Sequence, residues 1–143
     1  MKKFFRREEG FTLIELLVVV AVLGILAALA IPRLTGVTDR ARLAEAEQAI
    51  GSMKTGVEMY FVEHNSYTGL NTDPNNVTDG SAISQYIEFT SLPSNWDFMI
   101  TADATTFTIT ATGTGVNANL GARINQANVL EITRNGGTNW NAK

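Results

Sequence analysis

The sequence contains no cysteine and only one histidine, His64, among 143 residues. The absence of cysteine excludes disulfide bonds, thiol catalysis and zinc sites with thiolate ligands. No serine stands in a pattern with histidine and aspartate that would predict a hydrolase, and no phosphate-binding loop follows a predicted strand. His64 falls at the end of a predicted helix, where it suits the last carbonyl groups. We therefore expect no enzyme, no catalytic residue, no metal site and no cofactor.

Basic residues are too few to predict a nucleic-acid surface. The chain has 11 basic and 14 acidic residues, which gives a formal net charge of −3. Four basic and two acidic residues lie in the first ten positions, so the remainder carries 7 − 12 = −5. No basic patch with interleaved aromatic residues occurs, so we do not expect nucleic acid as the main partner.

One long apolar run dominates the N-terminal part of the chain. Leu16 to Ile31 comprises 16 consecutive apolar or glycine residues. As a helix, the 21 residues from Phe11 to Ile31 would be about 31 Å long, close to the roughly 30 Å of a bilayer's hydrocarbon core. The run is therefore long enough to span a membrane.

Gly10 is a small residue placed where a leader could be removed without losing the apolar run. In an ordinary secretory signal the cleavage site follows the apolar stretch, which is then discarded. Cleavage after Gly10 would instead keep this stretch in the mature protein. The basic residues before it favour an N-terminus on the cytoplasmic side of the membrane, a preference that the arginines beyond the run weaken.

Glu15 places one carboxylate inside the apolar run. A charged side chain at mid-helix costs about 2.5 to 3.5 kcal/mol on insertion scales, and such groups usually need a partner. Cleavage after Gly10 would create an α-amino group on Phe11, one helical turn away from Glu15. A carboxylate that lies near the helix end and reaches the lipid headgroups is the alternative.

The stretch RREEG followed by FTLIELLVVVAVLGILAALAIP resembles the class III leader and N-terminal helix of the type IV pilin superfamily. The resemblance covers about 32 of 143 residues and includes Gly10, Phe11, Glu15, the apolar run and Pro32. It implies a prepilin peptidase that cuts between Gly10 and Phe11 and then N-methylates Phe11. It also implies that Glu15 registers an incoming subunit by pairing with the N-terminus of a neighbour.

The same resemblance implies a function and its partners. We expect the major pilin of a type IV pilus, held in the cytoplasmic (inner) membrane as a precursor and polymerised with itself into a surface filament. An inner-membrane platform and an assembly ATPase would be further partners. The alternatives are a pseudopilin of type II secretion, a minor or adhesive pilin, and a membrane-anchored monomeric binding protein.

Two comparisons with the family refine this reading. Thr68 follows Tyr67 where major pseudopilins usually show Tyr-Pro, which argues against a pseudopilin. The stretch from Gly24 to Pro32 corresponds to one that can lose helicity in family filaments. Gly24 and Pro32 therefore predict a kink in the helix or its local melting.

Beyond Pro32 the pattern predicts an amphipathic helix and then strands. Apolar or small residues recur mostly three and four positions apart, at Leu34, Val37, Ala41, Ala44, Ile50, Met53, Val57, Tyr60 and Phe61. A loop rich in Asn, Gly, Asp and Pro follows, with a possible short helix over Ile83 to Phe89. From Trp96 the alternation of apolar residues and threonine predicts strands, whereas the glycines at 113, 115 and 121 indicate loops.

The predicted fold class is α+β. A long N-terminal helix, its hydrophobic half protruding and its amphipathic half packed, would lie against a small antiparallel β-sheet head of three to four strands. The expected segments are a cleaved leader (1–10), a hydrophobic transmembrane and polymerisation helix (11–32), an amphipathic helix (33–65), a loop (66–95) and the sheet with the C-terminal region (96–143). Because no disulfide can close this last region, strand pairing, Trp140 packing or neighbouring subunits must hold it.

Two short patterns in the loop are weaker signals. The stretch DPNNVTDGS has acidic and amide residues in alternation, but Val77 occupies a position where the calcium loop requires Asp or Asn. Asn76 with Thr78 forms a glycosylation sequon. Neither pattern predicts a site on its own.

Overall fold

The computed structural model describes residues 10–71, 77, 81–88 and 92–143, and of 32–35 only the backbone. Most of the predicted leader, the DPNNVTDGS stretch except Val77 and Ser81, and the sequon residues Asn76 and Thr78 lie outside these ranges. The chain forms two compact units, Met1–Val37 and Thr38–Lys143. Each is described by itself.

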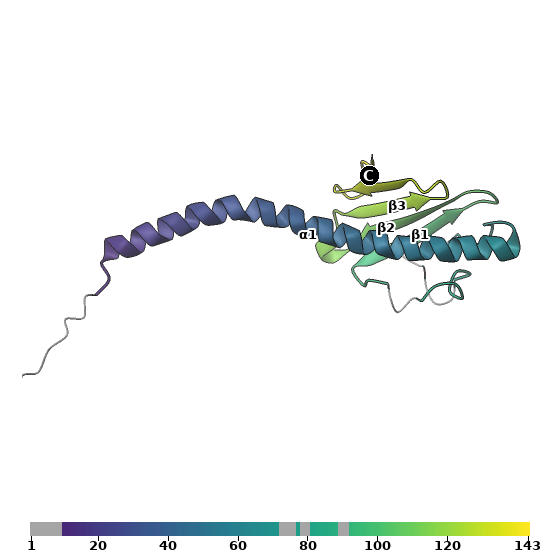
Figure 1. Cartoon of the computed structure of the whole chain (residues 1–143), viewed down its shortest axis with the longest axis horizontal. Coiled ribbons are helices and arrows are strands. Elements are labelled where there is room, and N and C mark those ends of the chain that lie inside the picture. The colour runs from purple at the N-terminus through teal and green to yellow at the C-terminus, as the bar shows by residue number, and fades with distance from the viewer. Residues whose placement is uncertain (1–9, 72–76, 78–80, 89–91) are drawn as a thin grey trace, which may run out of the picture. The chain divides into compact units, whose positions relative to one another are not determined.

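Helix α1 (Leu13–His64) contains 52 residues and contributes to both units (Figure 1). It is helical at Gly24 and at Pro32, so neither residue ends it. Among the described residues, α1 is the one helix long and apolar enough to cross a membrane. The sequence therefore predicted the long helix correctly.

The second unit contains a five-stranded antiparallel sheet whose strands follow each other in sequence order (Figure 1). The strands are β1 (Trp96–Ala102), β2 (Phe107–Gly113), β3 (Gly121–Asn125), β4 (Leu130–Thr133) and β5 (Asn141–Ala142), with a short 3₁₀ helix, η2 (Gly115–Asn117), before β3. Ile109 lies opposite Ile100 on one side and Ile124 on the other. The α+β prediction is confirmed, with five strands in place of three to four.

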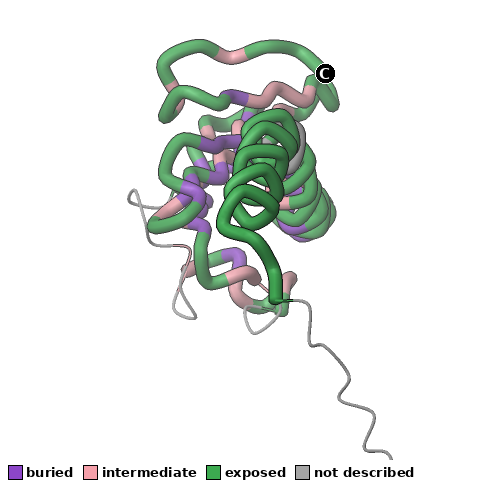
Figure 2. The backbone as a smooth tube through the Cα atoms, turned by 90° about the vertical axis from the view of Figure 1, so that its left-hand side faces the viewer, coloured by how far each residue is buried: buried purple, intermediate pink, exposed green. Residues whose placement is uncertain are grey.

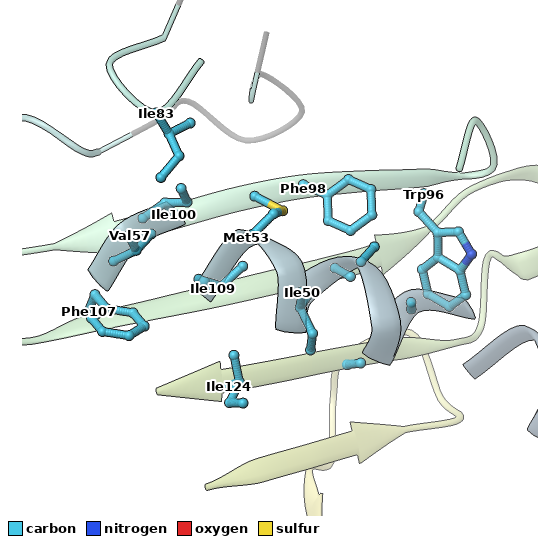
Figure 3. Close-up of a cluster of buried hydrophobic side chains, with 14 of the residues drawn as sticks. Ile50, Met53, Val57, Ile83, Trp96, Phe98, Ile100, Phe107, Ile109 and Ile124 are labelled. Carbon is cyan, nitrogen blue, oxygen red and sulfur yellow. The ribbon is translucent and has the colours of Figure 1, made fainter. Parts of the chain in front are cut away.

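The core lies between one face of the sheet and one face of α1. From the helix it takes Leu43, Ala46, Ala49, Ile50, Met53, Val57 and Tyr60, and from the strands Trp96, Phe98, Ile100, Phe107, Ile109, Ala111, Ala122 and Ile124. Figure 3 shows several of these side chains meeting between the two layers, and Figure 2 shows buried segments in the strands beside the helix. Burial of each large side chain contributes about 1.5 to 3 kcal/mol.

The predicted core face of the helix was wrong in its first turns. Val37, Ala41 and Ala44 are exposed, whereas Leu43 and its successors in the core are buried. Counting back from Ile50 in steps of four and three leads to Leu43, not to Ala44. A shift of one position turns a side chain by about 100° around a helix, so the earlier alanines point away from the sheet.

Strand β3 was not predicted, because Gly121 at its start indicated a loop. The structure explains this glycine by close packing. A Cβ atom there would lie 2.8 Å from the Thr133 side chain and 3.2 Å from the Trp140 ring. The strand therefore needs glycine because neighbouring side chains occupy the space beside it.

The predicted short helix over Ile83 to Phe89 is also wrong for its described part. Residues 82–86 form turns, in which the Tyr86 N–H donates to the Ile83 carbonyl at 2.9 Å. Ile83 is buried, which explains the apolar signal. The Tyr86 hydroxyl donates to Glu63 Oε2 at 2.6 Å, and this hydrogen bond raises the pKa of Tyr86 to about 12.

The C-terminal region is held without a disulfide. Strand β5 pairs with β4, and the Lys143 N–H donates to the Leu130 carbonyl at 3.0 Å. Lys143 Nζ lies 2.8 and 2.6 Å from the two carboxylate oxygens of Glu47 on α1. The Arg123 guanidinium lies 4.5 Å above the Trp140 ring. Strand pairing and Trp140 packing thus serve as expected, and an ion pair to the helix adds to them.

Two side chains organise the C-terminal end of strand β1 and the turn that follows it. Asp103, in the turn to β2, accepts hydrogen bonds from the backbone N–H and the hydroxyl of both Thr105 and Thr106. These bonds, with that from the Thr106 hydroxyl first, lower the pKa of Asp103 to about 2. The Asn71 amide bonds both backbone groups of Ala102, accepting from its N–H at 2.6 Å and donating to its carbonyl at 2.8 Å.

Candidate functional site

Helix α1 begins in a reciprocal arrangement of hydrogen bonds between Thr12 and Glu15. The Thr12 N–H and hydroxyl donate to Glu15 Oε2 at 2.9 and 2.7 Å. In return, the Glu15 N–H lies 3.3 Å from the Thr12 hydroxyl oxygen. Thr12 precedes the first helical residue, Leu13, so the pair forms a capping box that satisfies free donors at the helix start.

This arrangement gives Glu15 a partner that the sequence interpretation did not include. The expected partner was the α-amino group that cleavage would create on Phe11, whereas the uncut chain binds the carboxylate through Thr12. Phe11 is 85% exposed and lies just outside the helix. The pairing of Glu15 with the N-terminus of a neighbouring subunit stays a prediction.

Thr12 is the site residue that the sequence reasoning missed. The signal was present, because Ser or Thr followed three residues later by Glu is a pattern typical of a helix start. Glu15 drew attention for its charge within an apolar run, and its role in starting the helix was overlooked. The same carboxylate has both properties.

The apolar side chains that follow the capping box are exposed in their own unit. Fourteen large ones between residues 11 and 31 are 49 to 85% exposed, and these are Phe11, Leu13, Ile14, Leu16, Leu17, Val18, Val19, Val20, Val22, Leu23, Ile25, Leu26, Leu29 and Ile31. At about 1.5 to 3 kcal/mol each, leaving them in water would cost tens of kcal/mol. The segment therefore needs a lipid or protein environment.

The remaining predicted site residues lie in or beside this segment. Gly10 is exposed just before the helix, and cleavage after it stays a prediction. Gly24 lies within α1, and a Cβ atom there would meet nothing within 4 Å. Phe11 and Glu15 lie close to the helix start, whereas Gly24 and Pro32 lie further along it. Local melting between these two residues stays a prediction for an assembled filament.

The part of the chain that the structure describes shows no cluster of metal-binding side chains. It contains no group of three or more His, Cys, Asp or Glu side chains placed to hold a metal ion. His64 lies in the last turn of α1, with Nδ1 3.1 Å from the Tyr60 carbonyl oxygen, so this nitrogen is the donor. Its ring stacks on Tyr60 with 4.0 Å between centroids. The helix-end position predicted for His64 is confirmed.

The chain combines an apolar helical segment of membrane length, whose start is capped, with a small head in which a helix packs on an antiparallel sheet. This combination defines a pilin-like α+β protein. Comparison with known families agrees. The chain belongs to the type IV pilin superfamily. Residues 5–31 match the family described as "Prokaryotic N-terminal methylation motif". Residues 32–121, more than half of the chain, match the family described as "Type IV minor pilin ComP, DNA uptake sequence receptor".

Individual relatives fall into pilus and secretion proteins. The "Fimbrial protein" of Neisseria meningitidis serogroup B is 37% identical over 81 residues, which are 57% of this chain and 48% of that protein. The "Type II secretion system core protein G" of Aeromonas hydrophila is 40% identical over 62 residues, 43% of each chain. The "Type IV major pilin protein PilA" of Myxococcus xanthus is 40% identical over 68 residues, 48% of this chain and 31% of that one.

The chain therefore spans about half the length, or less, of these curated relatives. The relatives are named as a fimbrial protein, a secretion-system core protein and a major pilin, and neither they nor the two matched families are named as enzymes. No solved structure matches the chain.

Proposed function

We propose that this chain is the major structural subunit of a type IV pilus. It is processed between Gly10 and Phe11, methylated on Phe11 and polymerised through the apolar part of α1. The observation that carries the proposal is the exposed apolar surface of residues 11–31, which contains one carboxylate, that of Glu15. Such a surface can be stored in a bilayer and later covered by other copies of itself.

The chemistry of registration follows from the capping box. Before cleavage, Phe11 carries a peptide nitrogen and Glu15 accepts hydrogen bonds from Thr12. After cleavage, the α-amino group of a neighbour offers a full positive charge. In a low-dielectric surrounding, a pair of two opposite full charges is stronger than a hydrogen bond in which only the acceptor is charged, so Glu15 exchanges partners when subunits come together.

The energy balance of assembly requires an external motor. The apolar side chains are already away from water in the bilayer, so their transfer into a filament gains packing contacts but little new hydrophobic energy. An assembly ATPase acting through an inner-membrane platform supplies the difference. The precursor accordingly resides in the cytoplasmic membrane and the product on the cell surface.

The experiment separates the charge of Glu15 from its role in the helix start. Glu15→Gln keeps a side chain that can complete the capping box but removes the charge, whereas Thr12→Ala removes the cap and keeps the charge. We expect Glu15→Gln to be cleaved normally yet to yield few or no sheared fibres, with Thr12→Ala less impaired. Gly10→Lys should block cleavage altogether. Normal fibre yield from Glu15→Gln would disprove the registration step.

A second candidate, a minor pilin that receives DNA, is favoured by the family model that matches residues 32–121. The charge of this head argues against carrying that role over. Residues 38–143 contain 6 basic and 11 acidic residues, a balance of −5. Within the described part, four of these six basic side chains have partners. Arg42 donates to the Val116 carbonyl, and ion pairs join Lys54 to Glu58, Arg123 to Glu131 and Lys143 to Glu47. Phosphate contacts need unpaired Lys and Arg on one face.

Binding of duplex DNA by purified fibres decides between these two. The major-pilin proposal predicts weak binding with little salt dependence and abundant subunit in sheared surface fibres. Tight binding that falls steeply with salt, from a subunit scarce in the fibres, would support the minor-pilin role instead. A subunit that stays in the membrane fraction and supports protein export would support the pseudopilin role, which the relative named as core protein G favours.

A further inference from the structure

The outer face of the sheet carries a small polar hollow. Ile124 of β3 points to the core in Figure 3, so its strand neighbours Arg123 and Asn125 point to the opposite face. Around them lies a space of about 290 Å³, lined by Thr108, Arg123, Ile124, Asn125, Val129 and Glu131. Its lining comes from strands β2, β3 and β4 and from the turn before β4, all of which belong to the head.

Strand register and hydrogen bonds fix the polar side chains of this hollow. Thr108 lies opposite Asn125, and Arg123 lies opposite Glu131. Arg123 Nε donates to Glu131 Oε2 at 2.6 Å, and its guanidinium rests on the Trp140 ring. Asn125 Oδ1 accepts from the Val129 N–H at 3.0 Å. Side chains held in this way are oriented before any ligand arrives.

Much hydrogen-bonding capacity is left over. Within the described part of the chain, the Asn125 amide NH₂, the second oxygen of Glu131, the terminal nitrogens of Arg123 and the Thr108 hydroxyl have no partner of their own. Donors and acceptors therefore face the same small space. Arg123 and Glu131 are 36% and 28% exposed, so solvent and solutes reach them.

The charge of the site selects against ions. Arg123 and Glu131 cancel each other within one ion pair, and the head around them is net acidic. An anion would compete with the Glu131 carboxylate for the guanidinium, and a cation would meet the guanidinium itself. A neutral ligand with adjacent hydroxyl groups avoids both conflicts, because each hydroxyl donates and accepts.

We propose that this hollow binds one ring of a neutral pyranose sugar. One sugar hydroxyl donates to the unused oxygen of Glu131, and an adjacent one accepts from the Asn125 amide or the Arg123 guanidinium. Val129, 44% exposed at the rim, offers an apolar contact to the C–H face of the ring. The volume lies at the lower limit for ligand pockets, which suits a single ring. The site belongs to the head alone and does not depend on pilus assembly.

Saturation-transfer NMR on the full-length chain in detergent tests this proposal. The probes are the methyl α-glycosides of D-glucose, D-galactose and D-mannose, with inorganic phosphate as a competitor. We expect saturation transfer to at least one glycoside, unchanged by phosphate. Absence of transfer to all three would overturn the proposal, and so would displacement of the glycoside by phosphate, which would identify an anion site.

Point variants then locate the bound sugar. Asn125→Asp keeps the acceptor for the Val129 N–H but removes the amide donor, and Glu131→Gln removes the charge at equal size. Each should weaken binding about tenfold, because Asn125→Asp loses one hydrogen bond to the sugar and Glu131→Gln replaces a charged acceptor by a neutral one. The matched control Thr112→Ala, on the outer face of β2 but outside the hollow, should leave the affinity unchanged.

Folding of the variants is checked separately by near-ultraviolet circular dichroism of the two tryptophans. Unchanged affinity in both Asn125→Asp and Glu131→Gln would place the sugar elsewhere and overturn the assignment. An equal loss in Thr112→Ala would do the same, because that residue cannot contact a ligand in the hollow.

Discussion

The two units of this chain differ in whether their apolar side chains are exposed or buried. In residues 11–31 the apolar side chains are exposed, and the one carboxylate among them is held by a threonine next to the helix start. In residues 38–143 the apolar side chains form a closed core, and six charged side chains lie in three ion pairs. The first unit depends on its surroundings for stability, whereas the second is stabilised by its own contacts. Mutations should therefore act on one property at a time.

The largest effect on the head is expected from its core. Ile109 is fully buried at the centre of the sheet, between Ile100 and Ile124. Ile109→Ala should destabilise the head by about 2 to 5 kcal/mol, through lost burial and the cavity left behind. Denaturant unfolding followed by tryptophan fluorescence measures it, while membrane retention should not change. A concurrent loss of membrane retention would contradict the independence of the two units.

A comparable effect on the other unit should leave the head intact. Leu23 is 58% exposed within the apolar segment. Leu23→Lys puts a charge at mid-helix, at a cost of about 2.5 to 3.5 kcal/mol for insertion. We expect reduced membrane retention and few fibres, with an unchanged unfolding curve of the head. The control Leu23→Ile should behave like the parent, and a destabilised head in Leu23→Lys would show that the units are coupled.

The ion pair that secures the C-terminus should have a smaller effect. Lys143 approaches both oxygens of Glu47, whose side chain is only 17% exposed. Lys143→Met keeps the apolar stem but leaves this carboxylate without a cation, which should cost about 1 to 2 kcal/mol. Lys54→Met removes an i,i+4 pair within α1 but leaves behind Glu58, which is 50% exposed and can be solvated, so it should cost only about 0.3 to 0.5 kcal/mol. Equal effects from the two variants would argue against a special role for Lys143.

The smallest expected effect is a dependence on pH at the turn between β1 and β2. Hydrogen bonds from Thr106 and Thr105 lower the pKa of Asp103 from 3.8 to about 2. The folded state therefore gains stability from this carboxylate above pH 3.8 and loses it as the pH falls through about 2. Thermal unfolding between these values should show the loss, and Asp103→Asn should reduce it. An identical acid response in the variant would assign the effect to other groups.

The parts of the fold that the sequence predicted are those where a periodic pattern is long. The apolar run and the alternation in β1 and β2 each specify one kind of element. Strand β3 was missed because it begins with Gly121, which indicated a loop. The Thr133 side chain and the Trp140 ring, which leave no room for a Cβ atom there, lie far along the chain from this glycine. The pair of Lys143 and Glu47 joins residues 96 positions apart, and no local pattern reports such a contact. The predicted core face of the helix was wrong at Ala41 and Ala44, because alanine is common at both buried and exposed helix positions and so does not mark the buried face.

In the candidate site, too, local sequence patterns could be read, whereas contacts between distant residues could not. Gly10, Phe11 and Glu15 were identified from one contiguous motif. The role of Thr12 required attention to helix capping, and its pattern was visible in the sequence. The outer-face hollow could not be predicted, because Thr108, Asn125 and Glu131 come together only through the register of three strands.

The two hydrogen bonds between Asn71 and Ala102 limit the pairing of strand β1 with other chains. Strand β1 forms one edge of the sheet, and an open edge invites another chain to add a strand and start aggregation. The Asn71 amide bonds both the N–H and the carbonyl of Ala102. These two backbone groups are therefore not available to pair with an added strand. Asn71 thereby discourages a second head from adding a strand at this end of β1, through contacts that the head makes within itself.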